Sequence, residues 1–441
     1  MFSNRDLRRL IVPLFLEQLL VILVGLADTF VISYAGEAAV SGVSLVNSFN
    51  TIFIFLFTAL ASGGAVIVSQ YIGGEKMEMA GESASQLLMV STLFSGVVMA
   101  VLLLSGCPLM GLLFGKVESD VMDACMIYLR ISAYSYPALA IYNAGAALFR
   151  SIGKTSTTMY IAIFSNVINV VGNIIGVFAL HAGVAGVAVP SLIARTFSAV
   201  VVTILCFRKG NGVYYKKRWI CHFNAGLLKR ILGIAVPNGV EQGIFQFVKV
   251  ALSSVVALFG TSQIAANGIA QSIWSLAALV CVTMGPVFIT VIGQCMGSRD
   301  TEQAEYYFRK LLKITLLISV VWNVLVFTLT PLVMQFYDVS EETKKLTIIL
   351  VLIHNIFNCI AFPFADPLGK GMRAAGDVRF TMVISLATTI GVRLIFSLLF
   401  AIVMDMGVIG IAWAMCLDWC SRAVIFYIRF RKGKWKQFQL I

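Results

Sequence analysis

The stretch from Leu10 to Tyr34, LIVPLFLEQLLVILVGLADTFVISY, decides the class of this protein. It is long and apolar enough to cross a lipid bilayer as one helix. Two acids interrupt it, Glu17 and Asp28, and a carboxylate inside a membrane is costly unless it faces protein or water. At about 100° per residue both acids lie on nearly the same face of that helix, roughly 16 Å apart along its axis. The stretch therefore predicts a membrane helix with a role beyond crossing the bilayer.

The whole chain has the composition of a polytopic membrane protein. Of its 441 residues 59% are hydrophobic and 12% are charged, whereas about 25% are charged in soluble domains. The net charge of +12 is informative through the location of the cations in the loops between spans rather than through its sum. We therefore expect no nucleic-acid partner. Arg5, Arg8 and Arg9 precede a span that is too long for a signal peptide, so no cleaved signal is expected. The nine cysteines are interpreted as packing residues.

Splitting the apolar runs at polar or glycine-rich breaks predicts an all-α fold with twelve transmembrane helices. The spans are 10–34, 44–70, 84–106, 121–148, 156–180, 186–207, 231–258, 264–294, 312–335, 346–369, 379–404 and 408–430. They form two six-helix lobes, 1–207 and 231–441, joined by the basic segment 208–230, which we interpret as a solvated cytoplasmic linker near anionic headgroups.

The distribution of lysine and arginine sets the orientation of the chain. One set of loops, beginning with the N-terminus, carries most of these cations, and the opposite set carries only Lys116, Lys344 and Lys345. Positively charged loops remain in the cytoplasm, so both termini are predicted to be cytoplasmic.

The two lobes repeat each other at a constant distance along the sequence, the one that separates Pro13 from Pro237. We call this distance the repeat offset. It also carries Glu17 onto Glu241, Gln18 onto Gln242, Gln70 onto Gln294 and Gly73 onto Gly297, and an offset shorter by one carries Arg150 onto Arg373. Because six spans is an even number, the lobes share one orientation and are related by a pseudo-two-fold axis along the membrane normal. This arrangement is typical of alternating-access transporters.

The repeat separates the intramembrane acids into two groups. Glu17 and Glu241 occur in both lobes, which favours a structural or gating role, with transport an equal alternative. Asp366 has Lys370 one turn later, so an ion pair or gating role is expected, and Asp418 is paired in the same way by Arg422. The cations available to pair with such acids are Arg195, Arg393 and Arg422.

Asp28 has no twin, because Leu252 occupies the matching position, and no cation lies one turn away on its own helix. We therefore predict that Asp28 exchanges a proton or holds a monovalent cation, and Na+ there is the one metal expected.

Further polar side chains lie inside spans and must face the interior of a lobe, because exposure to lipid would be costly. They are the cavity and substrate candidates Asn47, Asn50, Asn166, Asn169, Asn173, Gln242, Gln246 and Lys249. Hydrogen bonding between helices is the alternative role for any one of them. The asparagine stripe of span five is long enough to predict a hydrated cavity beside Asp28.

Several motifs in order resemble the multidrug and toxic compound extrusion (MATE) family of secondary transporters. They are Asp28-Thr29, Gln70-x-x-Gly73, Gln294-x-x-Gly297, the loops Phe149-Arg150-Ser151-Ile152-Gly153 and Met372-Arg373-Ala374-Ala375-Gly376-Asp377, and Gly183-Val184-Ala185-Gly186-Val187-Ala188. The resemblance implies a two-lobe transporter in the cell membrane that exports organic, often cationic, compounds against inward H+ or Na+. It implies no enzyme activity and no cofactor, and we expect a monomer.

The resemblance implies a coupling role for Asp28, which occupies the family's acid in the first span. The second acid of the proton-coupled bacterial branch is replaced here by Asn173. The span-seven and span-ten acids of the sodium-type branch fall on Phe245 and Phe362. The coupling ion therefore stays open. A lipid-linked precursor flippase of the same superfamily is the alternative function, although such proteins carry a strongly cationic cavity and Lys249 is the one clear candidate cation.

Overall fold

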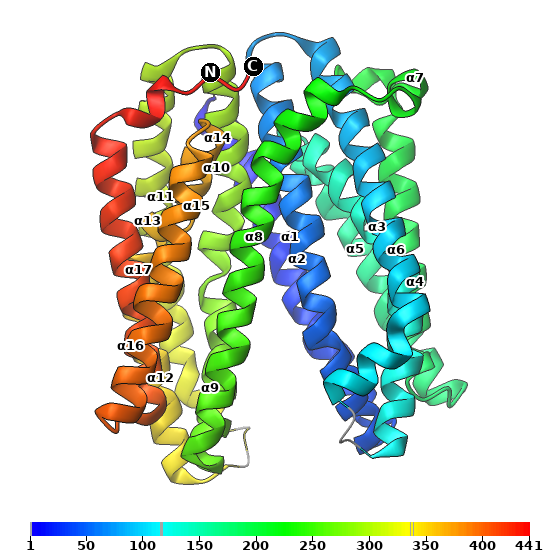
Figure 1. The fold of residues 1–441 in the computed structure, drawn as a ribbon, viewed down its shortest axis with the longest axis vertical. Coiled ribbons are helices and arrows are strands. Elements are labelled where there is room, and N and C mark those ends of the chain that lie inside the picture. The colour runs from blue at the N-terminus through cyan, green and yellow to red at the C-terminus, as the bar shows by residue number, and fades with distance from the viewer. Residues whose placement is uncertain (1, 115–117, 336, 338) are drawn as a thin grey trace. The chain divides into compact units, whose positions relative to one another are not determined.

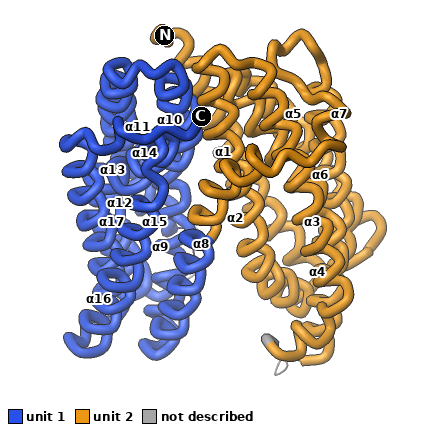
Figure 2. Tube along the Cα trace, turned by 45° about the horizontal axis from the view of Figure 1, so that its top comes forward, with its two compact units in different colours: residues 1, 240–441 blue, residues 2–239 orange. Residues whose placement is uncertain are grey.

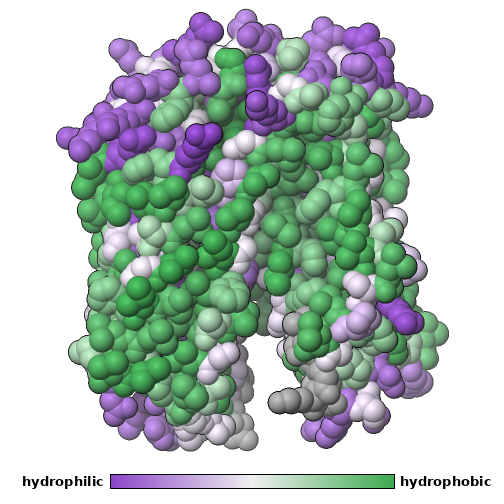
Figure 3. Space-filling model, in the orientation of Figure 1, coloured by the Kyte–Doolittle hydropathy of each residue, from purple (hydrophilic) through white to green (hydrophobic). Residues whose placement is uncertain are grey.

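The computed structural model describes residues 2–114, 118–335, 337 and 339–441 as helices and connecting turns with no β-strand (Figure 1). Within these residues, eleven helices are long and apolar enough to cross a membrane. Apolar side chains cover the middle of the helices and hydrophilic ones gather at their ends (Figure 3). The predicted all-α polytopic class is therefore confirmed. Lys116, used above for the orientation, lies outside the described residues.

The helices form two compact units, residues 2–239 and residues 240–441 (Figure 2). The first contains α1 (Asn4–Ser33), α2 (Glu37–Gly73), α3 (Met77–Phe114), α4 (Ser119–Ser151), α5 (Thr155–Ile174), η1 (Ile175–Ala179), α6 (Ala185–Cys206), η2 (Lys209–Asn211) and α7 (Lys217–Cys221). The boundary between the units falls inside α8 (Ala225–Val256). The two predicted lobes correspond to these units, and the limits 1–207, 208–230 and 231–441 stay predictions.

The second unit contains η3 (Ala257–Phe259), α9 (Thr261–Ala277), α10 (Leu279–Gly297), α11 (Thr301–Met334), α12 (Glu341–Ile360), α13 (Phe362–Ala365), α14 (Pro367–Ala374), α15 (Val378–Thr388), η4 (Thr389–Leu394), α16 (Ile395–Leu398), η5 (Leu399–Val403), α17 (Gly407–Arg431) and η6 (Lys434–Gln437). Pro363 and Pro367 divide the predicted tenth span into α12, α13 and α14, because proline removes a donor from a helix and clashes with the preceding turn.

Helix α4 corresponds to the predicted fourth span but is not one of the eleven apolar helices. Arg130, Pro137, Asn143 and several tyrosines and serines lower its hydropathy. It packs against α2, α3 and α6 inside its own unit. Contact with protein therefore makes up for the lower hydropathy of this helix.

The internal repeat is also visible in the backbone conformation. Gly36 and Gly260 precede matching helices with φ of +104° and +88°, a region that glycine adopts without the strain of a Cβ atom. Non-glycine residues with positive φ recur at the repeat offset: Glu75 with Arg299 and His181 with Asp405. The repeat is therefore a repeat of conformation as well as of residue type.

One π-helix breaks this repeat. The helices α5 and α15 begin at Thr155 and Val378, and the distance between these two residues is one residue shorter than the repeat offset. The π-helices η1 and η5, which come later, are separated by the full offset. The second unit therefore holds one extra residue between these points, and the π-helix η4 lies there without a counterpart at 165–170. A wider π turn absorbs one inserted residue, and such turns often mark functional sites.

Part of the segment 208–230 packs against α3, so the segment is not solvated throughout in the way that the sequence predicts. Gln86 of α3 donates from Nε2 to the carbonyl oxygens of Trp219 and His222, the latter at 2.6 Å. Trp219 and Tyr215 are buried, and Lys216 lies 3.4 Å from Glu78. Aromatic residues between the cations give the segment an apolar face that is buried, while Lys217 and Arg218 stay exposed.

The close approach of α6 to η1 gives a first prediction. A Cβ atom on Gly186 would lie 2.7 Å from the backbone carbon and oxygen of Gly176. Gly186→Ala must therefore push the two helices apart, and we expect a loss of about 1–3 kcal/mol in stability. Thermal unfolding in detergent measures it. Gly96→Ala in α3 is the control, because nothing lies within 4 Å of its Cβ position; equal midpoints for both variants would contradict the prediction.

Candidate functional site

Asp28 of α1 stands at the end of a hydrogen-bonded chain that crosses three helices of the first unit. Asn173 of α5 donates from Nδ2 to Asp28 Oδ1 at 2.6 Å and to Asn169 Oδ1 at 3.2 Å. Asn169 donates in turn to the Ser191 hydroxyl of α6 at 2.8 Å. Asn169 and Asn173 are buried. Of the three asparagines in the predicted span-five stripe, Asn173 thus contacts Asp28 directly and Asn169 is linked to it through Asn173.

A cation from another helix acts on Asp28. Arg195 of α6 interacts electrostatically with the Asp28 carboxylate. The Nη1 atom of Arg195 donates to the Ser135 hydroxyl of α4 at 2.7 Å. The sequence shows no cation near Asp28 on its own helix, and the fold supplies one from α6. Asp28 of α1 thus has an amide partner on α5 and a cation on α6.

The oxygens around Asp28 suit a proton or a small cation. Asn173 donates two hydrogen bonds from its amide, while its Oδ1 atom is buried without a hydrogen-bond partner in the described structure. The carboxylate can take up a proton, and carboxylate and amide oxygens can together ligate a small hard cation. Among the described residues, no group of three or more His, Cys, Asp or Glu side chains could hold a metal ion.

The remaining candidates of the first unit are bonded to helix α4 or stay unpaired. Tyr128 and Tyr136 of α4 donate to the side-chain oxygens of Asn47 and Asn50, respectively. Asn50 is buried and Asn47 is exposed. Asn166 is half-buried, and its Nδ2 atom is buried without a hydrogen-bond partner in the described structure. Asn50 thus acts between helices, which is the alternative role that the sequence leaves open.

Glu17 is buried at a junction of three helices of the first unit. Its Oε1 atom accepts from Arg150 Nη2 of α4 at 2.7 Å and from the Tyr142 hydroxyl at 3.3 Å. Its Oε2 atom accepts from the Thr158 hydroxyl of α5 at 2.8 Å. The carboxylate therefore joins α1, α4 and α5 through one ion pair and two hydrogen bonds.

Glu241 repeats this junction in the second unit. Arg373 of α14 donates from Nη2 to Glu241 and from Nε to the Thr381 hydroxyl of α15 at 3.1 Å. Both side chains of the ion pair are about nine-tenths buried. The same three residue types, Glu, Arg and Thr, thus recur in both units. The glutamates are separated by the repeat offset, and the arginines and threonines by one residue less.

The sequence alone leaves several partners open for these glutamates. Arg195, Arg393 and Arg422 are the cations it makes available, whereas the structure pairs Glu17 with Arg150 and Glu241 with Arg373. The charge distribution places both of these arginines in cytoplasmic loops, but they lie in the last turns of α4 and α14. Their duplication together with the glutamates is the signal that could have found the pairs.

Two acids of the second unit form the ion pairs expected from spacing. Lys370 donates to Asp366 Oδ2 at 2.8 Å. Arg422 donates from Nη2 to both oxygens of Asp418, at 2.9 and 3.1 Å. Neither carboxylate is left as an unpaired charge.

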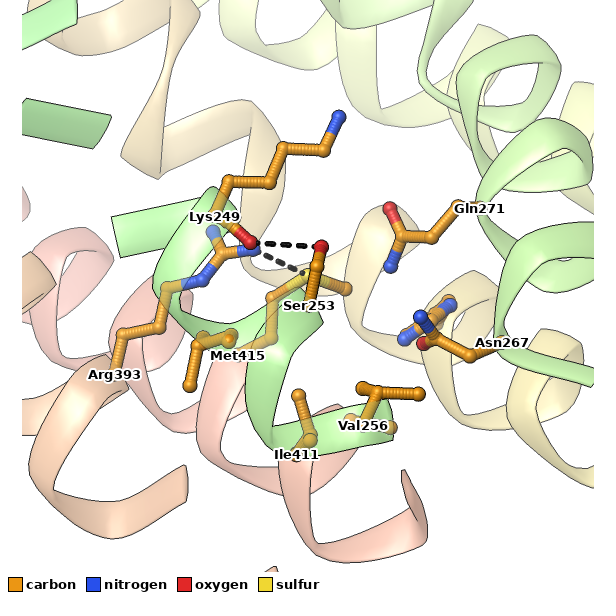
Figure 4. A pocket seen from close by; sticks show the side chains of 11 residues that line it. Lys249, Ser253, Val256, Asn267, Gln271, Arg393, Ile411 and Met415 are labelled. Atoms are coloured by element: carbon orange, nitrogen blue, oxygen red, sulfur yellow. Dashed lines mark hydrogen bonds between the residues drawn. The ribbon is translucent and has the colours of Figure 1, made fainter. Parts of the chain in front are cut away.

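Lys249 of α8 borders a small cavity of about 40 Å³ in the second unit (Figure 4). Gln242 and Gln246 lie earlier on the same helix and are half-buried. A second cation, Arg393 of η4, also lines this cavity. The sequence presents Arg393 only as a cation available to pair with an acid, and the fold decides that it lines this cavity.

The family model described as MatE matches this chain twice, at residues 13–175 and 237–399. The two matches begin at Pro13 and Pro237, which are separated by the repeat offset, and their ends at 175 and 399 are separated by the same distance. The match therefore confirms the internal duplication as well as the family that the motifs predicted.

Relatives and solved structures extend over nearly the whole chain. "Uncharacterized transporter YisQ" of Bacillus subtilis (strain 168) is 25% identical over 435 residues, which is 96% of this chain and 93% of that protein. "Probable multidrug resistance protein NorM" of Thermotoga maritima is 22% identical over 444 residues, with 98% and 93% covered. A solved structure described as the "Outward-facing conformation of a multidrug resistance MATE family transporter of the MOP superfamily" is 20% identical, with TM-score 0.89 over 98% of this chain and 96% of that one. The structural likeness shows a shared fold. With the family model matched in both halves, this protein belongs to the MatE family of multi-pass membrane transporters.

Proposed function

We propose that this protein is a secondary active multidrug efflux transporter, which exports organic, often cationic, compounds against inward H+ or Na+ by alternating access. The observation that carries the proposal is the Asp28 chain: a single acid without a twin, bonded to Asn173 and under the field of Arg195. The multidrug names of the relatives support the substrate class. The proposal includes a plasma-membrane location, cytoplasmic termini and a functional monomer.

The charge of Asp28 is the proposed switch. When a proton or cation neutralises Asp28, its attraction to Arg195 falls, and the packing of α1, α5 and α6 that this attraction favours loses stability. The ion then binds one packing of these helices better than the other, which is the condition for shifting their populations. Substrate binding favours the opposite packing, so the two are exchanged across the membrane.

Proteoliposomes containing the full-length protein test this proposal. An H+ gradient and a Na+ gradient are imposed in separate experiments. We expect the fluorescent cation rhodamine 123 to accumulate under one of them, and that gradient identifies the coupling ion. Empty liposomes and a dissipating ionophore are the controls. Transfer of a lipid-linked pyrophosphate without ion dependence, together with no rhodamine accumulation, would instead favour the flippase.

A further inference from the structure

The cavity of the second unit is lined by hydrogen-bond donors and apolar groups. Its polar side chains are Lys249, Ser253, Asn267, Gln271, His354 and Arg393 (Figure 4). Its apolar side chains are Leu252, Val256, Ile411, Ala412 and Met415. None of these described lining residues is an acid, so two cations face a cavity whose described lining offers them no anionic partner.

Arg393 is an unusual arginine because its charge is buried with few partners. Its side chain is 6% exposed. Its Nε and Nη1 atoms are buried and have no hydrogen-bond partner among the described residues. The Nη2 atom donates to the Met415 sulfur at 3.2 Å, a weak acceptor. The guanidinium also lies over the Phe245 ring at 4.8 Å, a contact of modest strength.

The acid that acts on Arg393 is already engaged elsewhere. Asp418 interacts electrostatically with Arg393, but both oxygens of Asp418 accept hydrogen bonds from Arg422. A buried charge inside a membrane protein is retained at a cost, and such residues commonly mark a ligand or ion path. The N–H groups of Nε and Nη1 can each donate a charge-assisted hydrogen bond to an anionic oxygen, such as that of a carboxylate.

The internal repeat shows that this cavity is the counterpart of the Asp28 site with its charge reversed. The repeat offset carries Asn169 and Ser191 onto Arg393 and Met415, and each pair is joined by a hydrogen bond. The same offset carries Asp28 onto Leu252, which lines the cavity. The first unit thus has an acid where the second has an apolar residue and an added arginine.

We propose that this cavity binds the carboxylate group of an amphipathic organic substrate, with Arg393 as its principal partner and Lys249 as a second cation. The apolar lining and the small volume admit one end of the compound. The proposal rests on the proposed function and narrows it: the transporter prefers zwitterions, whose anionic end enters this cavity, over otherwise identical cations. Arg393 and Lys249 are then the residues that determine this preference.

Rhodamine 110, which carries a free carboxylate, and rhodamine 123, its methyl ester, are a matched pair of probes. Fluorescence polarisation of each dye with the purified full-length protein in detergent measures binding without any need for transport. We expect rhodamine 110 to bind about tenfold more tightly, the difference made by a charge-assisted hydrogen bond. Arg393→Gln should abolish this preference, and Arg393→Lys should keep part of it. Arg431→Gln, the same change at an exposed residue of α17, should keep it entirely.

Several outcomes would overturn the proposal. Equal binding of both dyes to the wild-type protein would overturn it. An equal loss of binding of both dyes in Arg393→Gln would also overturn it, because that result would mark Arg393 as structural. A cavity that takes small anions only would appear as thermal stabilisation by acetate without any preference between the dyes. If Arg393→Gln fails to fold, Lys249→Gln provides the test, because Lys249 is exposed and its substitution should not disturb folding. Lys249→Gln should reduce the preference for rhodamine 110 about threefold.

Transport separates the failure of this proposal from failure of the proposed function. If neither dye showed ion-driven uptake, the antiporter would be refuted, whereas a binding preference in detergent would still support the cavity. Ion-driven uptake of rhodamine 123 without any preference for rhodamine 110 in binding would refute the cavity and leave the antiporter intact.

Discussion

Asp28→Asn is expected to abolish ion-driven uptake of rhodamine 123, with a loss of about a hundredfold or more, while the protein still folds and binds the dye. Asparagine has nearly the shape of aspartate, and its side-chain oxygen can still accept the hydrogen bond from Asn173. Only the ionisable charge is lost. A site whose charge no longer responds to the ion cannot favour one packing over the other, however tightly the substrate binds.

The measurement is the initial rate of uptake per folded molecule in proteoliposomes, with dye binding in detergent as a second readout. Asp123→Asn makes the same chemical change at an exposed position of α4 and should retain wild-type rates. Uptake at the wild-type rate in Asp28→Asn would remove Asp28 from the coupling mechanism. If Asp28→Asn lost both dye binding and dye uptake, Asp28 would be assigned to substrate binding instead.

Glu17→Gln is expected to reduce stability by about 3 kcal/mol, because it removes the buried carboxylate that forms an ion pair with the half-buried Arg150. Removing one member of a buried pair is costly even where the intact pair contributes little by itself. Glu241→Gln in the second unit should behave alike, because Arg373 has the same relation to Glu241. Transport per folded molecule should change less than twofold in either variant.

Thermal unfolding in detergent and the yield of monodisperse protein measure this effect. Glu75→Gln is the matched control, because Glu75 is exposed. The double variant Glu17→Gln, Arg150→Gln should recover part of the stability, since both charges of the ion pair are then removed together. A variant with an unchanged unfolding midpoint but no transport would show that the Glu17 junction belongs to the transport cycle.

Patterns spread along the chain were enough to predict much of the architecture. The apolar runs predicted the membrane helices, and the internal repeat predicted two lobes of similar fold. Asp28 was distinguished by its lack of a twin. The helices and the lobes could be predicted because a lipid environment demands long apolar helices with internal hydrogen bonds, and a duplicated sequence folds twice in the same way.

Contacts between distant residues were decided by the tertiary structure. The duplication of Arg150 and Arg373 marks them as candidates, but the pairing of Glu17 with Arg150 depends on where α4 lies beside α1. The same holds for Arg195, which acts on Asp28 from another helix. The apolar face of segment 208–230 became evident only when its aromatic residues were seen against α3.

The first stretch, Leu10 to Tyr34, shows both kinds of information. By itself it determined that the chain crosses a membrane and that two acids lie inside it, because length, apolarity and helical phase are local properties. Only the folded units determined what each acid contacts: Glu17 is held by a cation and a hydroxyl from two neighbouring helices, whereas Asp28 meets an asparagine chain. The place of Arg393 is likewise decided only by the fold, where the wider π turn η4 absorbs the added residue and Arg393 lines the cavity.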